Sequence, residues 1–230
     1  MGLGGAQGQL YRPATAVAVA GAPLLFLVAN VIHPEEFALD HEREQLAEIA
    51  ANYTTWQFAH FLTFASVVVF GAAALGLAYL VRRQRPTAGL VGGALALTGL
   101  FGLAFVVALD GYTWAILGEV SARPEADVQT LEFALNDVQQ SNWSIPYYAT
   151  PLLFIAGLAL LALTAARQGA IPLGAALLLS LGALLVGLEA LFKDNTYFIV
   201  AAAVLFLGGA AVATALSRMS DADYEAGRAP

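Results

Sequence analysis

The sequence contains no cysteine and a single lysine, and charged residues make up only 12% of it. Without cysteine, the chain cannot form disulfides, thiolate metal sites or C-x-x-C redox centres, and it has no cysteine nucleophile. It also lacks any cluster of basic residues interleaved with aromatic residues, which is the electrostatic footprint of nucleic-acid binding. Cysteine-dependent chemistry and nucleic-acid binding are therefore excluded.

Hydrophobic residues make up 59% of the 230 residues. Soluble domains have about 45–50% apolar and about 25% charged residues. A chain this apolar could not cover its surface with polar groups in water, whereas the hydrocarbon of a lipid bilayer is a suitable solvent for it. The composition therefore predicts an integral membrane protein, with the lipid bilayer as its main partner.

Six segments are apolar enough to cross the bilayer as helices, for which about 20 residues are needed. They cover roughly residues 15–32, 56–81, 88–109, 145–166, 171–192 and 197–216. The sequence thus predicts an all-α bundle of six transmembrane helices that forms one domain, residues 1–219. The third helix could continue to Leu117, which would draw Asp110 into the membrane. Residues 220–230 are polar and predict a disordered tail.

The charged residues between the spans alternate in sign along the chain. Acidic residues crowd into residues 35–48 and 119–137, whereas arginines occupy the other connections: Arg12, Arg82, Arg83, Arg85, Arg167 and Arg218. Because Lys and Arg mark the cytoplasmic side, this pattern predicts a plasma-membrane protein with both termini in the cytoplasm. A cleaved signal peptide is the alternative for the first segment, but its apolar run is long and no clear A-x-A site follows it.

Both acidic connections contain apolar residues at helical spacing, each after a proline. Pro34 precedes the stripe Leu46, Ile49, Ala50 and Tyr53, and Pro124 precedes the stripe Val128, Leu131, Leu135 and Val138. A proline in the first turn favours the start of a helix. We expect two short amphipathic helices on the outer interface, within about residues 36–51 and 124–138. The aromatic residues expected in the outer interfacial belt are Trp56, Trp114, Trp143, Tyr147 and Tyr148.

Two further patterns concern how the spans pack. Residues 22–27 (APLLFL) resemble residues 150–155 (TPLLFI), as in an inverted repeat of three spans, but the long loop after the first span has no counterpart after the fourth. Glycines also recur inside the spans, at 89, 93, 99, 102, 174, 182, 187, 208 and 209. Small residues allow helices to approach closely, so these faces could hold the bundle together or bind a second copy or another membrane protein.

Four ionisable residues fall at one depth, near the outer ends of different spans: His33, His60, Asp110 and Glu189. Such groups are costly in a membrane, usually face the bundle interior and therefore indicate function. They are the candidate ligand-binding residues, and we expect His60 to point inward, close to at least one of the other three. Simpler explanations are a hydrogen bond from His60 to Asn30, a tyrosine or a backbone carbonyl, and an ion pair between Glu189 and Lys193 four residues later.

The cofactor and the activity stay open. Imidazole and carboxylate groups suit a metal ion, with His33 and His60 as its first ligands, and two facing histidines could also hold a haem. No H-E-x-x-H or similar metal-binding spacing supports either. Three functions compete: an outer pocket for a metal, haem, lipid or small ligand; a small secondary transporter; and an accessory or sensor protein without catalysis. The sequence does not decide whether the protein is an enzyme.

Overall fold

The computed structural model describes residues 4–35, 41–133, 144–188 and 195–228, and all regular structure in these ranges is helical. Five long apolar helices are able to cross a membrane: α1 (Gly4–Ile32), α3 (Tyr53–Arg82), α4 (Pro86–Ser121), α6 (Ser144–Arg167) and α9 (Asn195–Arg218). A sixth apolar helix, α7 (Leu173–Gly187), has 15 residues. The predicted all-α class is confirmed, and five of the predicted spans are long apolar helices.

The six apolar helices form a closed ring in chain order. Each helix packs against the next one, from α1 through α3, α4, α6 and α7 to α9, and α9 packs against α1. The buried core follows this ring and is built from small and aliphatic residues, such as Ala74 and Leu77 of α3, Leu161 of α6 and Leu205 of α9. A ring of six helices encloses a central space to which all of them can contribute side chains.

The outer surface of the ring is strongly apolar. Large exposed side chains occur on every wall, among them Phe61, Val68, Phe101, Leu181 and Leu207. Soluble monomers rarely expose contiguous apolar patches of more than a few hundred Å². A helical bundle has no unpaired backbone groups along its walls, so lipid can cover such a surface. The chain is therefore a helical membrane bundle.

Glycines bring neighbouring helices of the ring into backbone contact. A side chain at Gly99 or Gly157 would overlap the facing backbone across the α4–α6 contact, and one at Gly182 or Gly208 would do so between α7 and α9. Of the glycines singled out in the sequence, only Gly174 has open space around it within the described residues. These glycines thus pack the chain against itself, and the idea of a second copy or partner on their faces gains no support.

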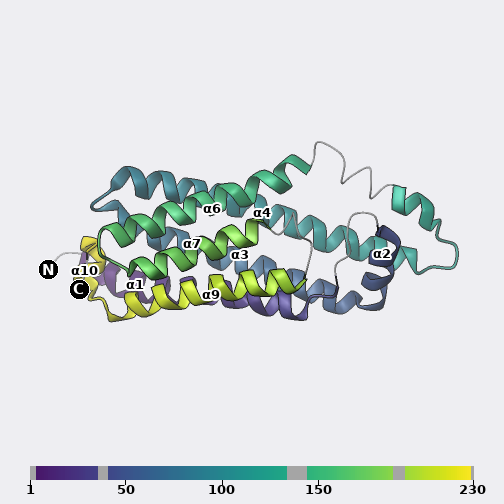
Figure 1. Cartoon of the computed structure of the whole chain (residues 1–230), viewed down its shortest axis with the longest axis horizontal. Helices are drawn as coiled ribbons and strands as arrows, with labels where there is room; N and C mark the ends of the chain where they lie inside the picture. Colours follow the sequence, from purple (N-terminus) through teal and green to yellow (C-terminus); the bar gives the residue numbers. More distant parts are fainter. Residues whose placement is uncertain (1–3, 36–40, 134–143, 189–194, 229–230) are drawn as a thin grey trace.

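Helices form in both acidic connections, but they begin several residues after the positions that the prolines suggested. Helix α2 (Glu42–Ala51) and the helical residues 128–133 lie at the end of the bundle opposite the two termini (Figure 1). Pro34 and Pro124 are outside them. The second helix begins where Asp127 accepts a hydrogen bond from the Thr130 backbone N–H, at 3.2 Å, since a capping carboxylate satisfies an unpaired N–H of the first turn.

The C-terminal segment differs from the prediction of a disordered tail. Residues Asp221–Ala226 form α10, capped by the Ser220 hydroxyl, which accepts from the Asp223 N–H at 3.1 Å. The helix ends at Gly227, whose φ of 66° is easily adopted by glycine. Tyr224 anchors α10 because its side chain is fully buried against α1 and α3. This polar sequence is thus ordered by a capped turn, one buried aromatic ring and an ion pair from Asp221 to Arg12.

Candidate functional site

His60 and Asp110 lie at the same level in the bundle. At about 1.5 Å per residue, α3 is about 33 Å long from His60 to Arg82, and α4 about 36 Å from Pro86 to Asp110. The hydrocarbon core of a bilayer is about 30 Å thick. With the arginine end of the bundle at one membrane surface, both side chains therefore lie near the other. Helix α4 continues past Asp110 to Ser121, so the aspartate stands within a helix.

His60 points into the bundle, and only 12% of its side chain is exposed. Its Nε2 lies 3.3 Å from Oδ2 of Asp110, and its Nδ1 donates to the backbone carbonyl of Trp56 at 3.0 Å. The imidazole packs directly on Gly111, where an added Cβ would come within 2.6 Å of the His60 Cβ. Glycine is therefore the residue that allows α4 to approach His60 closely enough for the neighbouring aspartate to reach it.

His33 follows the last residue of α1 and brings a second imidazole to the site. Its ring centroid is 5.0 Å from that of His60, and its Nδ1 donates to the Pro34 carbonyl at 2.8 Å. The pKa of His33 is lowered to about 4, mainly by burial and to a smaller extent by the nearby His60, because both disfavour the charged imidazolium. His33 is therefore a neutral, oriented imidazole at neutral pH.

Trp56 completes an aromatic cluster with the two histidines. Its ring centroid lies 4.7 Å from that of His33 and 4.6 Å from that of His60. The tryptophan is only 3% exposed, so its predicted place in the interfacial belt is wrong. Trp56 and His60 are four residues apart on one helix, a spacing that puts them on the same face. This spacing was the available signal that both belong to one inward site.

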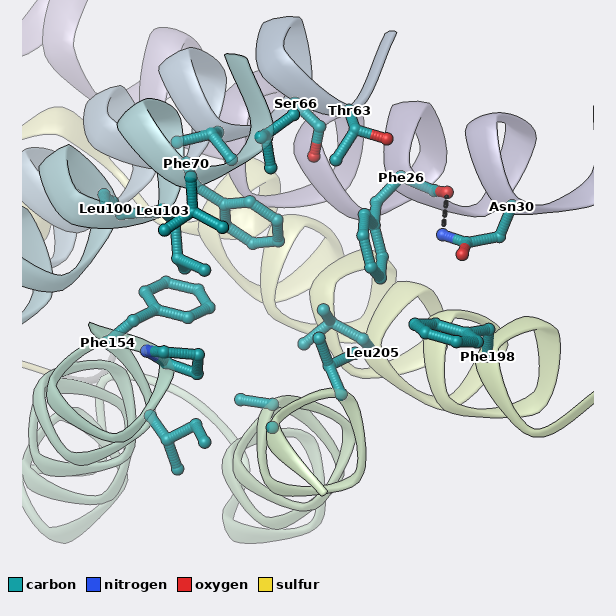
Figure 2. A pocket seen from close by; sticks show the side chains of 18 of the residues that line it. Phe26, Asn30, Thr63, Ser66, Phe70, Leu100, Leu103, Phe154, Phe198 and Leu205 are labelled. Carbon is teal, nitrogen blue, oxygen red and sulfur yellow. Dashed lines mark hydrogen bonds between the residues drawn. The ribbon is translucent and has the colours of Figure 1, made fainter. Parts of the chain in front are cut away.

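Below this cluster, the ring encloses a cavity of about 180 Å³. His33, His60 and Asp110 line one part of it, and the remainder is mostly apolar. Figure 2 shows the aromatic side chains of Phe26, Phe70, Phe154 and Phe198 around the space, with Leu100, Leu103 and Leu205. Asn30, Thr63 and Ser66 add polar groups to its wall. The site is therefore an apolar chamber with one polar end.

The sequence identified the polar end of the site but not the chamber. The structure brings His33, His60 and Asp110 together, whereas Glu189 and Lys193 lie outside the described residues. The hydroxyl residues were overlooked, although Thr63 follows His60 by three residues and Ser66 follows Thr63 by three. That helical spacing places them on the face of His60. The aromatic residues could not be recognised, since Phe is common throughout the spans.

The hydrogen bonds of His60 bear on the metal ion or haem that the sequence left open. Within the described ranges, no group of three or more His, Asp or Glu residues has an arrangement that could hold a metal ion. Both ring nitrogens of His60 already have partners, one a backbone carbonyl and the other a carboxylate. A metal or haem iron would have to displace one of them.

Comparisons of the chain with protein-family models, with curated proteins and with solved structures give no match. A function for this bundle must therefore be argued from the site itself, in particular from the shape of the chamber and from the hydrogen bonds at its polar end.

Proposed function

We propose that this protein binds a small amphiphilic molecule inside the ring, with the ligand's polar head beside His60 and Asp110 and its apolar body in the chamber. The observation that carries the proposal is the cavity itself, which joins this polar pair to an aromatic and aliphatic lining. Ligand sites are typically such apolar hollows with a few converging polar groups. The protein is on this proposal a ligand-binding membrane protein, with no catalytic step assigned.

The size of the chamber limits the ligand. An apolar cavity of about 150 Å³ is known to stay dry and to bind molecules as small as benzene. The cavity here measures about 180 Å³, so it suits a chain or ring of roughly that bulk and not a whole phospholipid. Burying such an apolar body gains about 25 cal/mol per Å² of surface removed from water. The apolar part supplies the affinity, and the polar end orients the molecule.

The polar end faces the outside of the cell in this proposal. Both termini lie at the opposite end of the bundle (Figure 1). Arginines gather there, since α3, α6 and α9 end in Arg82, Arg167 and Arg218 and Arg12 pairs with Asp221 of α10. An excess of arginine marks the cytoplasmic surface. This orientation requires six crossings, with α7 as the sixth. The ligand would then enter from the outer surface or the outer leaflet of the plasma membrane.

Binding is favoured over transport by the distribution of polar groups. A pathway across the membrane needs polar groups along its whole length, as in transporters with sites at the midplane. Here the wall beyond Ser66 is formed by side chains such as Phe70, Leu100, Phe154 and Leu205. The chamber therefore resembles a blind pocket.

The test is to fill the chamber. Val106 lines it, whereas Val68 is 59% exposed on the outer surface of α3. We expect Val106→Phe to abolish binding of nonan-1-ol, measured on detergent-purified protein by native mass spectrometry and by the rise in Tm. The matched variant Val68→Phe should bind like the parent protein. Equal binding by both variants would refute a site in the chamber.

A further inference from the structure

The polar side chains around the chamber share one feature: each donates a hydrogen to a backbone carbonyl. The two hydroxyl groups of the wall both donate to backbone carbonyls: Thr63 to Ala59 at 3.0 Å and Ser66 to Ala22 at 2.8 Å. The Asn30 amide nitrogen is likewise turned to its own helix, where it donates to the Phe26 carbonyl at 2.7 Å (Figure 2). Besides these donated hydrogens, the two hydroxyl groups and the Asn30 amide present oxygen lone pairs, and the Asn30 NH₂ group keeps one further N–H.

The histidines follow the same pattern. A backbone carbonyl only accepts hydrogen bonds, so the Nδ1 atoms of His33 and His60 must both carry their hydrogen, and both donate it to the main chain. The Nε2 of His60 and Oδ2 of Asp110 share a hydrogen across 3.3 Å. The carboxyl group of Asp110 retains acceptor capacity beyond this contact, and its side chain is 38% exposed.

One buried donor near the site has no partner within the described part of the chain, the indole N–H of Trp56. Trp56 packs against the histidine rings from the side and is not among the residues that line the chamber. Its N–H therefore does not change the character of the wall, which is rich in acceptors.

Building on the proposed function, we infer that the ligand is an amphiphile whose head donates a hydrogen bond and carries no negative charge, such as an alcohol. An acceptor-rich wall offers an ether or ester oxygen few donors, and a buried polar group without a partner costs the full loss of its hydration. A carboxylate or phosphate head would in addition need several donors, which an acceptor-rich wall does not supply, and burying a charge without such partners costs far more than burying a neutral group.

The experiment uses two isomers that differ only in the donor. Nonan-1-ol and 1-methoxyoctane have the same atoms and nearly the same bulk, but the ether has no O–H. Purified protein in detergent is given both in equal amounts, and protein-bound and micelle-bound fractions are measured by gas chromatography. The alcohol should be preferred about tenfold, the usual weight of a hydrogen bond to a charged or strongly polar acceptor. Nonanoate at pH 8 should bind more weakly still.

Substitutions at the wall test the cause of that preference. Asp110→Asn replaces an acceptor oxygen by an NH₂ donor of the same size, and should reduce the discrimination against the ether and against nonanoate by about tenfold. Glu119→Gln makes the same chemical change on an exposed side chain outside the chamber, and should leave the selectivity intact. Should Asp110→Asn fail to fold, Thr63→Val removes a wall oxygen without altering charge, and should reduce the preference for the alcohol to a smaller extent.

The outcomes separate the two proposals. If none of the three compounds binds more strongly to the parent protein than to Val106→Phe, the chamber is not a ligand site and the proposed function fails. If all three bind in the chamber with equal affinity, the proposed function stands and the inference about the head is wrong. If nonanoate binds best, the wall recognises an anion and the inference is overturned.

Discussion

The end of the bundle that carries both chain termini is closed by α10, whereas the opposite end leads into the chamber. At the closed end, the Tyr224 hydroxyl donates to the Gly76 carbonyl at 2.9 Å and lies 2.8 Å from the Thr15 hydroxyl. An ion pair of 2.7 Å between Arg12 and Asp221 links α1 to α10. The contacts of α10 with α1 join residues 209 apart in the sequence, and that with α3 joins residues 148 apart, so α1, α3 and α10 are held together.

At the opposite end, the polar groups are less buried than Tyr224 and face a cavity: the side chains of His60 and Asp110 are 12% and 38% exposed. Nε2 of His60 and Oδ2 of Asp110 are 3.3 Å apart, a longer contact than those of the Tyr224 hydroxyl, and both residues line the chamber. Buried polar groups stabilise a fold when all their hydrogen bonds are made within the protein. Groups with remaining capacity can serve a ligand instead. The comparison thus separates an end that stabilises the fold from the end at which we propose that a ligand binds.

The largest effect should come from removing the anchor of the closed end. Tyr224→Ala deletes a fully buried aromatic side chain, which typically costs about 3–5 kcal/mol. The free energy of unfolding should fall by about this amount, and the residues of α10 should become sensitive to protease. Tyr224→Phe keeps the ring and should cost only about 1–2 kcal/mol. Binding of nonan-1-ol should persist in the phenylalanine variant; its loss there would show that the two ends are not separate.

The two ends should also respond to opposite extremes of pH. The pKa of His33 is about 4 in the folded protein and 6.5 in the unfolded chain. Burial of the neutral imidazole therefore contributes its full stabilisation above pH 6.5. This contribution, up to about 3 kcal/mol, is lost as the pH falls towards 4. Burial raises the pKa of Tyr224 from 10.0 to about 12, so the closed end loses stability as the pH rises from 10 to 12.

Unfolding measured across both pH ranges separates these contributions from those of other residues. His33→Gln should flatten the acid limb and leave the alkaline limb as it is, while Tyr224→Phe should do the reverse. An acid limb unchanged by His33→Gln would mean that His33 is not buried as a neutral group.

The smallest effect is expected from one methyl group at the binding end. Gly111→Ala would place its Cβ about 2.6–2.8 Å from His60 atoms and push the imidazole away from Asp110. Such overpacking typically costs about 1–3 kcal/mol, partly offset because alanine favours a helix over glycine by up to about 1 kcal/mol. Gly71→Ala is the control, since nothing lies within 4 Å of its Cβ, and it should be neutral or slightly stabilising. Equal Tm values in the two variants would contradict the close packing of His60 on α4.

The composition and the hydrophobic pattern alone determined the helical class, the membrane setting and the approximate bounds of the spans. These properties follow from the length of an apolar run and the sign of the charges beside it, which are local in the sequence. The shared depth of His33, His60 and Asp110 was equally predictable, because depth along a helix follows from residue number at a fixed rise. The helical character of α2 could be predicted from its apolar stripe, whereas its first residue could not.

Only the tertiary structure decided which faces of the helices pack against one another. The order of the helices around the ring, the chamber within it and the burial of Trp56 depend on the rotation of each helix about its axis. In these spans nearly every face is apolar, so the sequence hardly encodes that rotation. The docking of α10 could not be predicted for the opposite reason. Its sequence is almost entirely polar, and the one residue that anchors it, Tyr224, is buried only in the folded bundle. Close packing of particular side chains, and not hydrophobicity as such, fixed both features.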